Sequence, residues 1–166
     1  MGNLKYYRKE PEVKIKSIVL TWILCFAVAA VCTATEANMG TWKLNESKSK
    51  LNPAGGKNHT VIYVADGDNI KITVDGVDGK GQATHNEWTG KFDGKEYPVT
   101  GDPNSDARSY VIVDDHTLHM TSKNGGKPVA ELHIVVSADG KSRTVTVNST
   151  DSEGKKISTT AVYDKQ

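Results

Sequence analysis

The sequence predicts an all-β fold, an antiparallel up-and-down meander of about eight to ten strands that closes into a barrel. The segments between turns are short and rich in Val, Ile, Thr and Tyr, and none shows a helical stripe of apolar residues. Turn-forming pairs, mostly Asp-Gly and Asn-Gly, recur at 66–67, 78–79, 93–94, 124–125, 139–140 and 153–154. Nearly all connections have hairpin length, and closure would remove exposed strand edges.

The first five strands are expected in the half of this domain that begins at Gly40. The first, 40–44, is short, and a longer connection separates it from 58–65. The third, 69–75, alternates apolar and polar residues, as a half-buried strand does. Turn pairs precede the strands expected at 82–89 and 95–99.

The second five strands follow at similar spacing. Those expected at 107–113, 117–123 and 127–136 are joined by hairpin-length turns. The strand at 142–149 alternates clearly, and the last, 156–163, closes the meander. This regular succession of short strands favours a barrel or a sandwich, and the hairpin connections favour the barrel.

The register can be predicted in one region. A two-residue turn at Asp139-Gly140 predicts the pairs Val136–Arg143, Ile134–Val145 and Leu132–Val147. Arg143 then shares a face with apolar residues. A three-residue loop at 124–126 predicts that Met120 lies opposite Ala130 and that Leu118 lies opposite Leu132.

The segment before the barrel is typical of a secretory signal peptide. Basic residues between Lys5 and Lys16 precede an apolar run of 14 residues over 18–31. That run is short for a membrane span, which needs roughly 20 residues. Small residues allow cleavage after Ala34 or Ala37. We therefore expect residues 1–37 to be removed and the barrel domain, 38–166, to be exported to the periplasm or secreted; the alternative is an uncleaved N-terminal anchor.

Composition excludes several functional classes. The 166-residue chain has a net charge of +1, whereas a dedicated nucleic-acid binder carries a clear basic excess. Both cysteines, Cys25 and Cys32, lie in the segment expected to be removed, so the domain has no disulfide, thiolate metal site or Cys nucleophile. No catalytic motif is present, and we predict no enzyme activity and no cofactor.

Short motifs at both ends of the domain resemble known barrel families. Gly40-Thr41-Trp42 is similar to the Gly-x-Trp signature of lipocalins and fatty-acid-binding proteins, and 160–165 is similar to the closing strand of the latter. The chain also resembles uncharacterised secreted bacterial proteins that carry Gly-Thr-Trp-Lys-Leu-Asn and the segment found here at 97–103. The resemblance implies a lipocalin-like (calycin) barrel in which Gly40 and Trp42 are structural and Trp42 closes one end.

The chain departs from fatty-acid-binding proteins at two points. Their helical lid has no room in the 45–56 segment, and their carboxylate-binding Arg falls on Ala161, although Tyr163 is retained. A three-residue loop at 151–153 would place Arg143 opposite Ala161, where it would supply the missing guanidinium. The alternative, which we favour, places Arg143 at the barrel mouth with its charged end in water.

The predicted function is non-covalent binding of a small apolar or amphipathic ligand in the barrel. The residues expected to line the ligand cavity are Tyr63, Trp88, Tyr97, Tyr110, Arg143 and Tyr163. The alternative is an envelope or extracellular interaction module whose barrel is filled by its own side chains. A small lipophilic ligand is the expected partner, nucleic acid is not, and a membrane is contacted only through the signal segment; the oligomeric state is left open.

No metal site is predicted. His116 and His119 are three apart and point to opposite faces of a strand. His119 and His133 are expected at diagonal positions on the outer face, roughly 7–8 Å apart, and a surface metal site there is an alternative that we do not favour. His59 and His85 have no carboxylate spacing that suggests a ligand set. The acidic segment 102–106 lacks the pattern of a calcium loop and is interpreted as turn chemistry.

Overall fold

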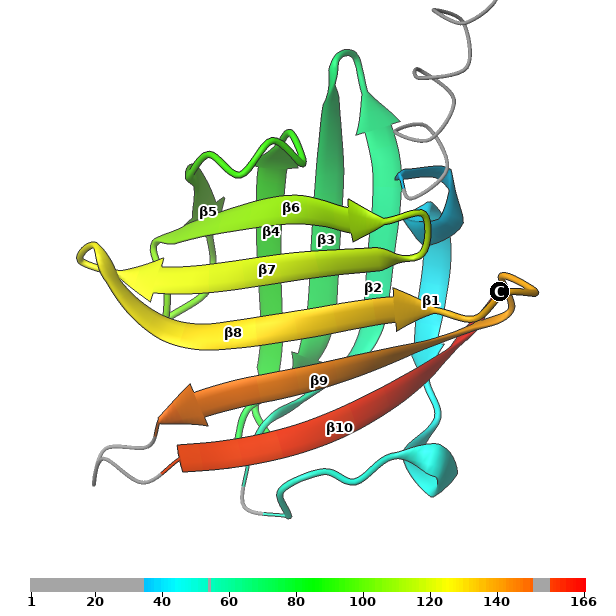
Figure 1. The fold of residues 1–166 in the computed structure, drawn as a ribbon. Coiled ribbons are helices and arrows are strands. Elements are labelled where there is room, and N and C mark those ends of the chain that lie inside the picture. Colours follow the sequence, from blue (N-terminus) through cyan, green and yellow to red (C-terminus); the bar gives the residue numbers. More distant parts are fainter. Residues whose placement is uncertain (1–34, 54, 151–155) are drawn as a thin grey trace, which may run out of the picture.

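The computed structural model describes residues 35–53, 55–150 and 156–166, apart from the Thr150 side chain, and these form a closed antiparallel barrel. Strands β6–β10 cross steeply over β1–β4, so the barrel is flattened into two layers (Figure 1). Each strand pairs with its neighbours in the chain, and β1 also pairs with β10. The strands are β1 (Gly40–Leu44), β2 (Lys57–Asp66), β3 (Asn69–Val77), β4 (Ala83–Gly90), β5 (Tyr97–Thr100), β6 (Ala107–Asp114), β7 (Thr117–Asn124), β8 (Lys127–Val136), β9 (Ser142–Thr150) and β10 (Lys156–Lys165).

The predicted meander and its closure are confirmed, and all strand boundaries agree within two residues. The clearest difference is β5, which begins at Tyr97 rather than at 95. The Asp93 carboxylate accepts a hydrogen bond from the Lys95 backbone N–H, so the turn extends further than expected. Between β1 and β2 the described residues form the 3-10 turn η1 (Glu46–Lys48), and Lys50 makes an isolated bridge to Thr160.

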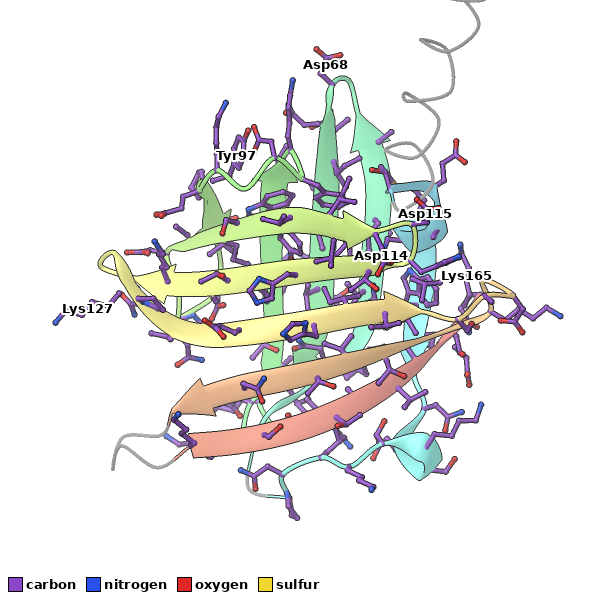
Figure 2. The ribbon with its side chains drawn as sticks, viewed as in Figure 1. Asp68, Tyr97, Asp114, Asp115, Lys127 and Lys165 are labelled. Atoms are coloured by element: carbon purple, nitrogen blue, oxygen red, sulfur yellow. The ribbon has the colours of Figure 1, made fainter. Side chains whose placement is uncertain are left out.

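The two ends of the barrel differ. The Trp42 end contains the start of β1, the end of β10 and the turns 67–68, 115–116 and 137–141. The mouth contains the 45–56 connection and the loops 78–82 and 101–106. Figure 2 shows Asp114 and Lys127 at opposite sides of the front layer, at the far ends of the β6–β7–β8 meander.

The predicted register is confirmed between β8 and β9 and wrong at two other places. Val136 pairs with Arg143, as the Asp139-Gly140 turn implied. Met120 pairs with Leu132 rather than Ala130, because a bulge at Ser122/Lys123 accompanies a two-residue turn at 125–126. The β9–β10 pairing sets Arg143 opposite Tyr163, not Ala161. Thr150 pairs with Lys156, so the connection is two residues longer than the three assumed; the predicted 153–154 turn lies outside the described residues.

Residues 1–34 lie outside the described residues, so removal of a signal segment stays a prediction. The described part begins with a helical turn at 35–38, directly before β1. Within the ranges that the structure describes, no helix has the length and apolar character needed to cross a membrane.

The loop that contains Gly101, at the mouth, approaches the backbone of β4 closely. The φ of Gly101 is +79°, and a Cβ there would collide with the His85 carbonyl oxygen. Gly67 also has a positive φ, +58°, but a Cβ there would meet nothing within 4 Å. We expect Gly67→Ala to cost about 1–2 kcal/mol of unfolding free energy for the backbone conformation. Gly101→Ala should cost at least about 1 kcal/mol more, and equal values from urea denaturation would contradict the close approach.

Candidate functional site

The barrel encloses a cavity of about 670 Å³ between its mouth and the Trp42 end. One wall is apolar and comes from β8, β9 and β10, which present Ala130, Leu132, Ile134, Val145, Val147 and Ala161. These are the alternate residues of each strand, which the pleat directs inward. The volume lies within the range of small-molecule sites, roughly 300–1,000 Å³. The interior is therefore not filled by its own side chains.

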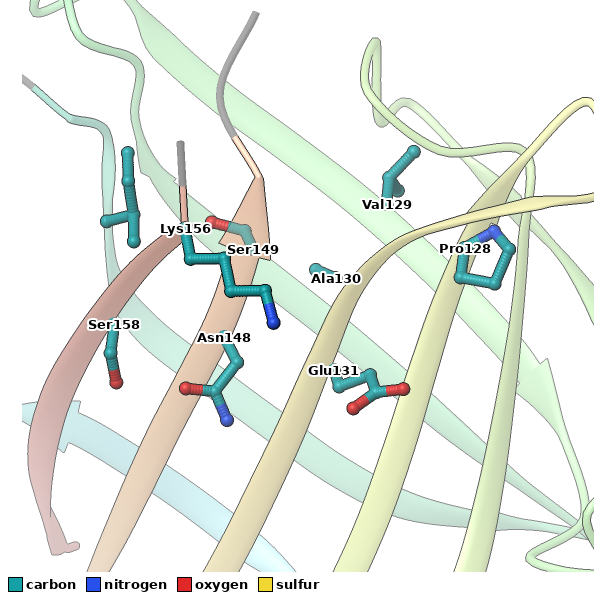
Figure 3. Close-up of a pocket in the computed structure, with 9 residues that line it drawn as sticks. Pro128, Val129, Ala130, Glu131, Asn148, Ser149, Lys156 and Ser158 are labelled. Atoms are coloured by element: carbon teal, nitrogen blue, oxygen red, sulfur yellow. The ribbon is translucent and has the colours of Figure 1, made fainter. Parts of the chain in front are cut away.

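A smaller hollow of about 590 Å³ lies where β8 leaves β9, beyond the last pair, Ala130 and Ser149 (Figure 3). Pro128 and Val129 border it from β8, and Asn148 and Ser149 border it from β9. Val129, Ala130 and Ser149 line both this hollow and the barrel cavity. The hollow and the barrel cavity therefore adjoin each other at these residues.

Arg143 lies at the Trp42 end of the cavity, surrounded by aromatic rings. Its guanidinium carbon is 4.8 Å from the ring centroid of Trp42, 5.0 Å from that of Tyr63 and 4.9 Å from that of Tyr163. The side chain is 2% exposed, so the favoured expectation of a water-exposed Arg143 at the mouth is wrong. The cause is its place directly after the 137–141 turn, at the end that Trp42 covers, where ring faces replace water around the cation.

No carboxylate pairs with Arg143 among the described residues, and its buried Nε and Nη1 atoms have no hydrogen-bond partner there. A buried cation without a counter-charge is costly unless other groups stabilise it. The three rings supply part of that stabilisation. Arg143 also lines the cavity, so it gives this end a positive charge.

Three tyrosines that were expected to line the cavity do so, and they converge near Arg143. Tyr63, Tyr110 and Tyr163 are all buried. Burial raises the pKa of Tyr163 to about 12, against the opposing effect of Arg143. Burial raises the pKa of Tyr110 still further, with a smaller contribution from Tyr63. The hydroxyls of Tyr110 and Tyr163 therefore stay protonated and can donate hydrogen bonds; that of Tyr163 donates to the Asn58 carbonyl at 3.0 Å.

A polar group that lines the cavity near its mouth was missed by the sequence analysis. Arg108, on β6, donates to Asn86 Oδ1 at 2.9 Å and to Asp102 Oδ2 at 2.7 Å. Ser105 donates to the same carboxylate oxygen at 2.6 Å. The pairing of Arg108 with Ser122 and the Arg108–Asp102 contact tie the mouth loop 101–106 to the barrel wall.

A signal for the inward direction of Arg108 was present in the sequence. Arg108 is two residues before Tyr110, so both point inward on the same strand. The interpretation of 102–106 as turn chemistry holds for Asp102, which accepts the Asn104 backbone N–H, but leaves out its ion pair. Burial tends to raise the Asp102 pKa, yet the hydrogen bonds of Ser105, Asn104 and Arg108 prevail and lower it.

Trp88 and Tyr97 belong to a filled part of the core and not to the cavity lining. Trp88 is fully buried. Its ring centroid lies 4.6 Å from the ring centroid of Tyr110, 5.7 Å from that of Tyr97 and 6.2 Å from that of Phe92. Tyr97, half-buried at the start of β5, donates to Asp93 at 3.1 Å (Figure 2). The expectation that these two residues line the ligand cavity is therefore not met by their positions.

The histidines of the described chain do not gather into a group of three or more. His85 Nδ1 is 2.7 Å from Asp75 on the exposed outer face, a cross-strand contact of β3 and β4. Within the described ranges, no group of three or more His, Cys, Asp or Glu side chains is arranged to hold a metal ion. The expected diagonal placement of His119 and His133 is wrong, because the β7–β8 bulge sets them directly opposite each other.

Comparison with known proteins gives likenesses of fold only. No family model matches the chain, and no curated protein matches it by sequence. The structure of EF1p2_mFAP2b bound to DFHBI has a TM-score of 0.48 and 11% identity, over 81% of this chain and 98% of that one. The redesigned β-barrel mFAP1 bound to DFHBI gives 0.45 and 18%, over 80% and 99%. Lobster apocrustacyanin A1 gives 0.42 and 15%, over 79% of this chain and 62% of that one.

The closed up-and-down meander is itself a lipocalin-like barrel, since consecutive antiparallel strands close by pairing the first with the last. The fold prediction is therefore confirmed by the strand pairing of this chain.

Proposed function

We propose that the protein binds a small amphipathic molecule non-covalently in its barrel cavity. The observation that carries this proposal is the cavity of about 670 Å³, which has one apolar wall and a few polar groups at defined places. An apolar ligand body would pack against β8, β9 and β10. Its polar group would lie near the tyrosine hydroxyls and the Arg143 cation, which lacks a carboxylate partner among the described residues.

The proposal retains the hypothesis that Arg143 binds an acidic group of the ligand, but at a different position from the one expected. The guanidinium lies beside Tyr163 and not beside Ala161. Most of its surface already packs against aromatic rings, so an acidic group would approach only from the cavity side. An anionic amphiphile is the ligand class that this arrangement supports best.

A binding role has more support than a catalytic one. Arg108 and Asp102 form an ion pair in the cavity wall, with side chains only 9% and 16% exposed. Hydrogen bonds lower the pKa of Asp102 and occupy its oxygens, whereas a general base needs a free, poised carboxylate. A filled interaction module has less support, because it would have no use for the cavity.

Filling the cavity should abolish binding. Anilinonaphthalene sulfonate, an anionic amphiphile, is expected to bind one site per chain, as read by its fluorescence. Ala161→Trp places an indole in the cavity and should weaken this binding by at least about tenfold, or about 1.4 kcal/mol. Val135→Trp adds the same side chain on the exposed outer face and should leave binding unchanged. Equal binding by both variants would contradict a ligand site inside the barrel.

Export is proposed on the sequence alone. One experiment can test both export and the presence of a natural ligand. Native mass spectrometry of the protein from its own host should show a chain lacking the first 34 or 37 residues and carrying a co-purified small molecule. An intact N-terminus would support the anchored alternative. A ligand-free mass together with failure to bind the probe would count against the binding role.

A further inference from the structure

His119 and His133 form a close cross-strand pair on the outer face of the barrel. They are directly opposite each other on β7 and β8, with ring centroids 4.8 Å apart and planes tilted by 37°. The Val136 N–H donates to the His116 carbonyl, so residues 116 and 136 form a hydrogen-bonded pair. Since pair types alternate along antiparallel strands, 119 and 133 form a non-hydrogen-bonded pair, the type whose side chains are closer.

No other described side chain binds either ring of this pair through a hydrogen bond or an ion pair, in contrast to His85, which contacts Asp75. The direct neighbours across the strands are Val111 on β6 and Thr146 on β9, which carry no charge. His133 is exposed and His119 is half-buried, so solvent and ions reach both rings. The ring nitrogens are therefore available as ligands.

We infer that His119 and His133 form a bidentate surface site for a late first-row divalent transition ion such as Ni²⁺, Cu²⁺ or Zn²⁺. Neutral imidazole suits these ions, whereas Ca²⁺ and Mg²⁺ prefer oxygen ligands. The paired strands hold both histidines at fixed positions, so only side-chain rotation is needed to direct a nitrogen of each ring to one ion. No third protein ligand joins them within the described residues, so water would complete the coordination and the ion would exchange readily.

This site is independent of the cavity, because both side chains lie on the outer face of strands whose alternate residues, Met120 and Ile134, are buried. Its failure would leave the proposed binding function untouched, and the reverse also holds.

Calorimetry of the untagged full chain with Ni²⁺ tests the inference. Cys25 and Cys32 are replaced by Ser in every variant, because thiolates also bind such ions. We expect one ion per chain. Loss of an outer-shell partner already lowers metal affinity by about 10–100-fold, so His119→Gln and His133→Gln should each weaken binding by at least that much. His59→Gln and His116→Gln, which remove unpaired imidazoles, should have no effect.

Paramagnetic broadening locates the ion independently. Ni²⁺ should broaden the amide resonances of β7 and β8 around these two histidines before any others. The Gln substitutions are at surface positions, so the circular dichroism of the barrel should stay unchanged. Absence of stoichiometric binding, unchanged affinity when His119→Gln and His133→Gln are combined, or broadening centred elsewhere would overturn the inference.

Discussion

Replacing Trp42 by Ala is expected to lower the free energy of unfolding by about 3–5 kcal/mol, the usual cost of removing a large buried aromatic side chain. Trp42 is 0% exposed, and its indole N–H donates to the Asn38 carbonyl at 2.8 Å. Its ring faces also contact the cations of Arg143 and Lys165. Since a domain of this size is stable by only about 5–15 kcal/mol, the variant should lose a large share of its stability.

The contribution of the Trp42–Arg143 contact can be separated by a double-mutant cycle. Trp42→Ala, Arg143→Met and the double variant are compared by urea denaturation with the unchanged protein. A desolvated cation–π contact is worth up to about 2 kcal/mol, so we expect a coupling energy of about 1–2 kcal/mol. Arg143 also touches Tyr63 and Tyr163, so it should retain part of its effect when Trp42 is absent.

Trp42→Phe serves as the control, because it keeps a ring face but removes the indole N–H. It should cost clearly less than Trp42→Ala. A small loss for Trp42→Ala, or a coupling energy near zero, would show that Trp42 and Arg143 do not close this end of the barrel as a unit.

The fold could be predicted because the features that specify it, strand alternation and turn pairs, lie in short stretches of sequence. Alternation in β3 and β9 and the Asp-Gly turns depend on residues close in sequence, and the turn at 139–140 set the β8–β9 register correctly. The inward direction of Arg143 followed from the same parity. Its burial did not, because burial depends on Trp42, Tyr63 and Tyr163, which come from three other strands.

The parts that could not be predicted depend on one or two extra residues in a bulge or connection, or on contacts between residues far apart in the sequence. The bulge at Ser122/Lys123 moved His119 from a diagonal to a direct position opposite His133. Two extra residues between β9 and β10 moved Arg143 from Ala161 to Tyr163. Arg108 and Asp102 are close in sequence, but Asn86, which completes their group, comes from β4. No local pattern specifies such a three-part contact.

The Arg108–Asp102 ion pair is expected to be the second strong determinant of stability. The two side chains are only 9% and 16% exposed, and Arg108 would be left with a buried charge if its partner were lost. Breaking a buried ion pair by removing one partner typically costs about 3–5 kcal/mol. We expect a loss in this range for Asp102→Asn, measured by urea denaturation at neutral pH. Asp68→Asn, in the exposed pair with Lys91, should cost less than about 1 kcal/mol.

The loss caused by Asp102→Asn should shrink as the pH falls, and the sign follows from proton linkage. Hydrogen bonds lower the pKa of Asp102 in the folded protein below that of the unfolded chain, so the folded state releases this proton more readily. The stabilisation by the carboxylate is therefore complete above the unfolded value, near about 3.9, and is lost as the pH falls through the lower folded value. Protonated Asp102 is nearly isosteric with Asn, so the two proteins should then converge in stability. A difference that stayed constant from pH 7 into this acid range would mean that the ionised carboxylate does not hold the mouth loop to Arg108.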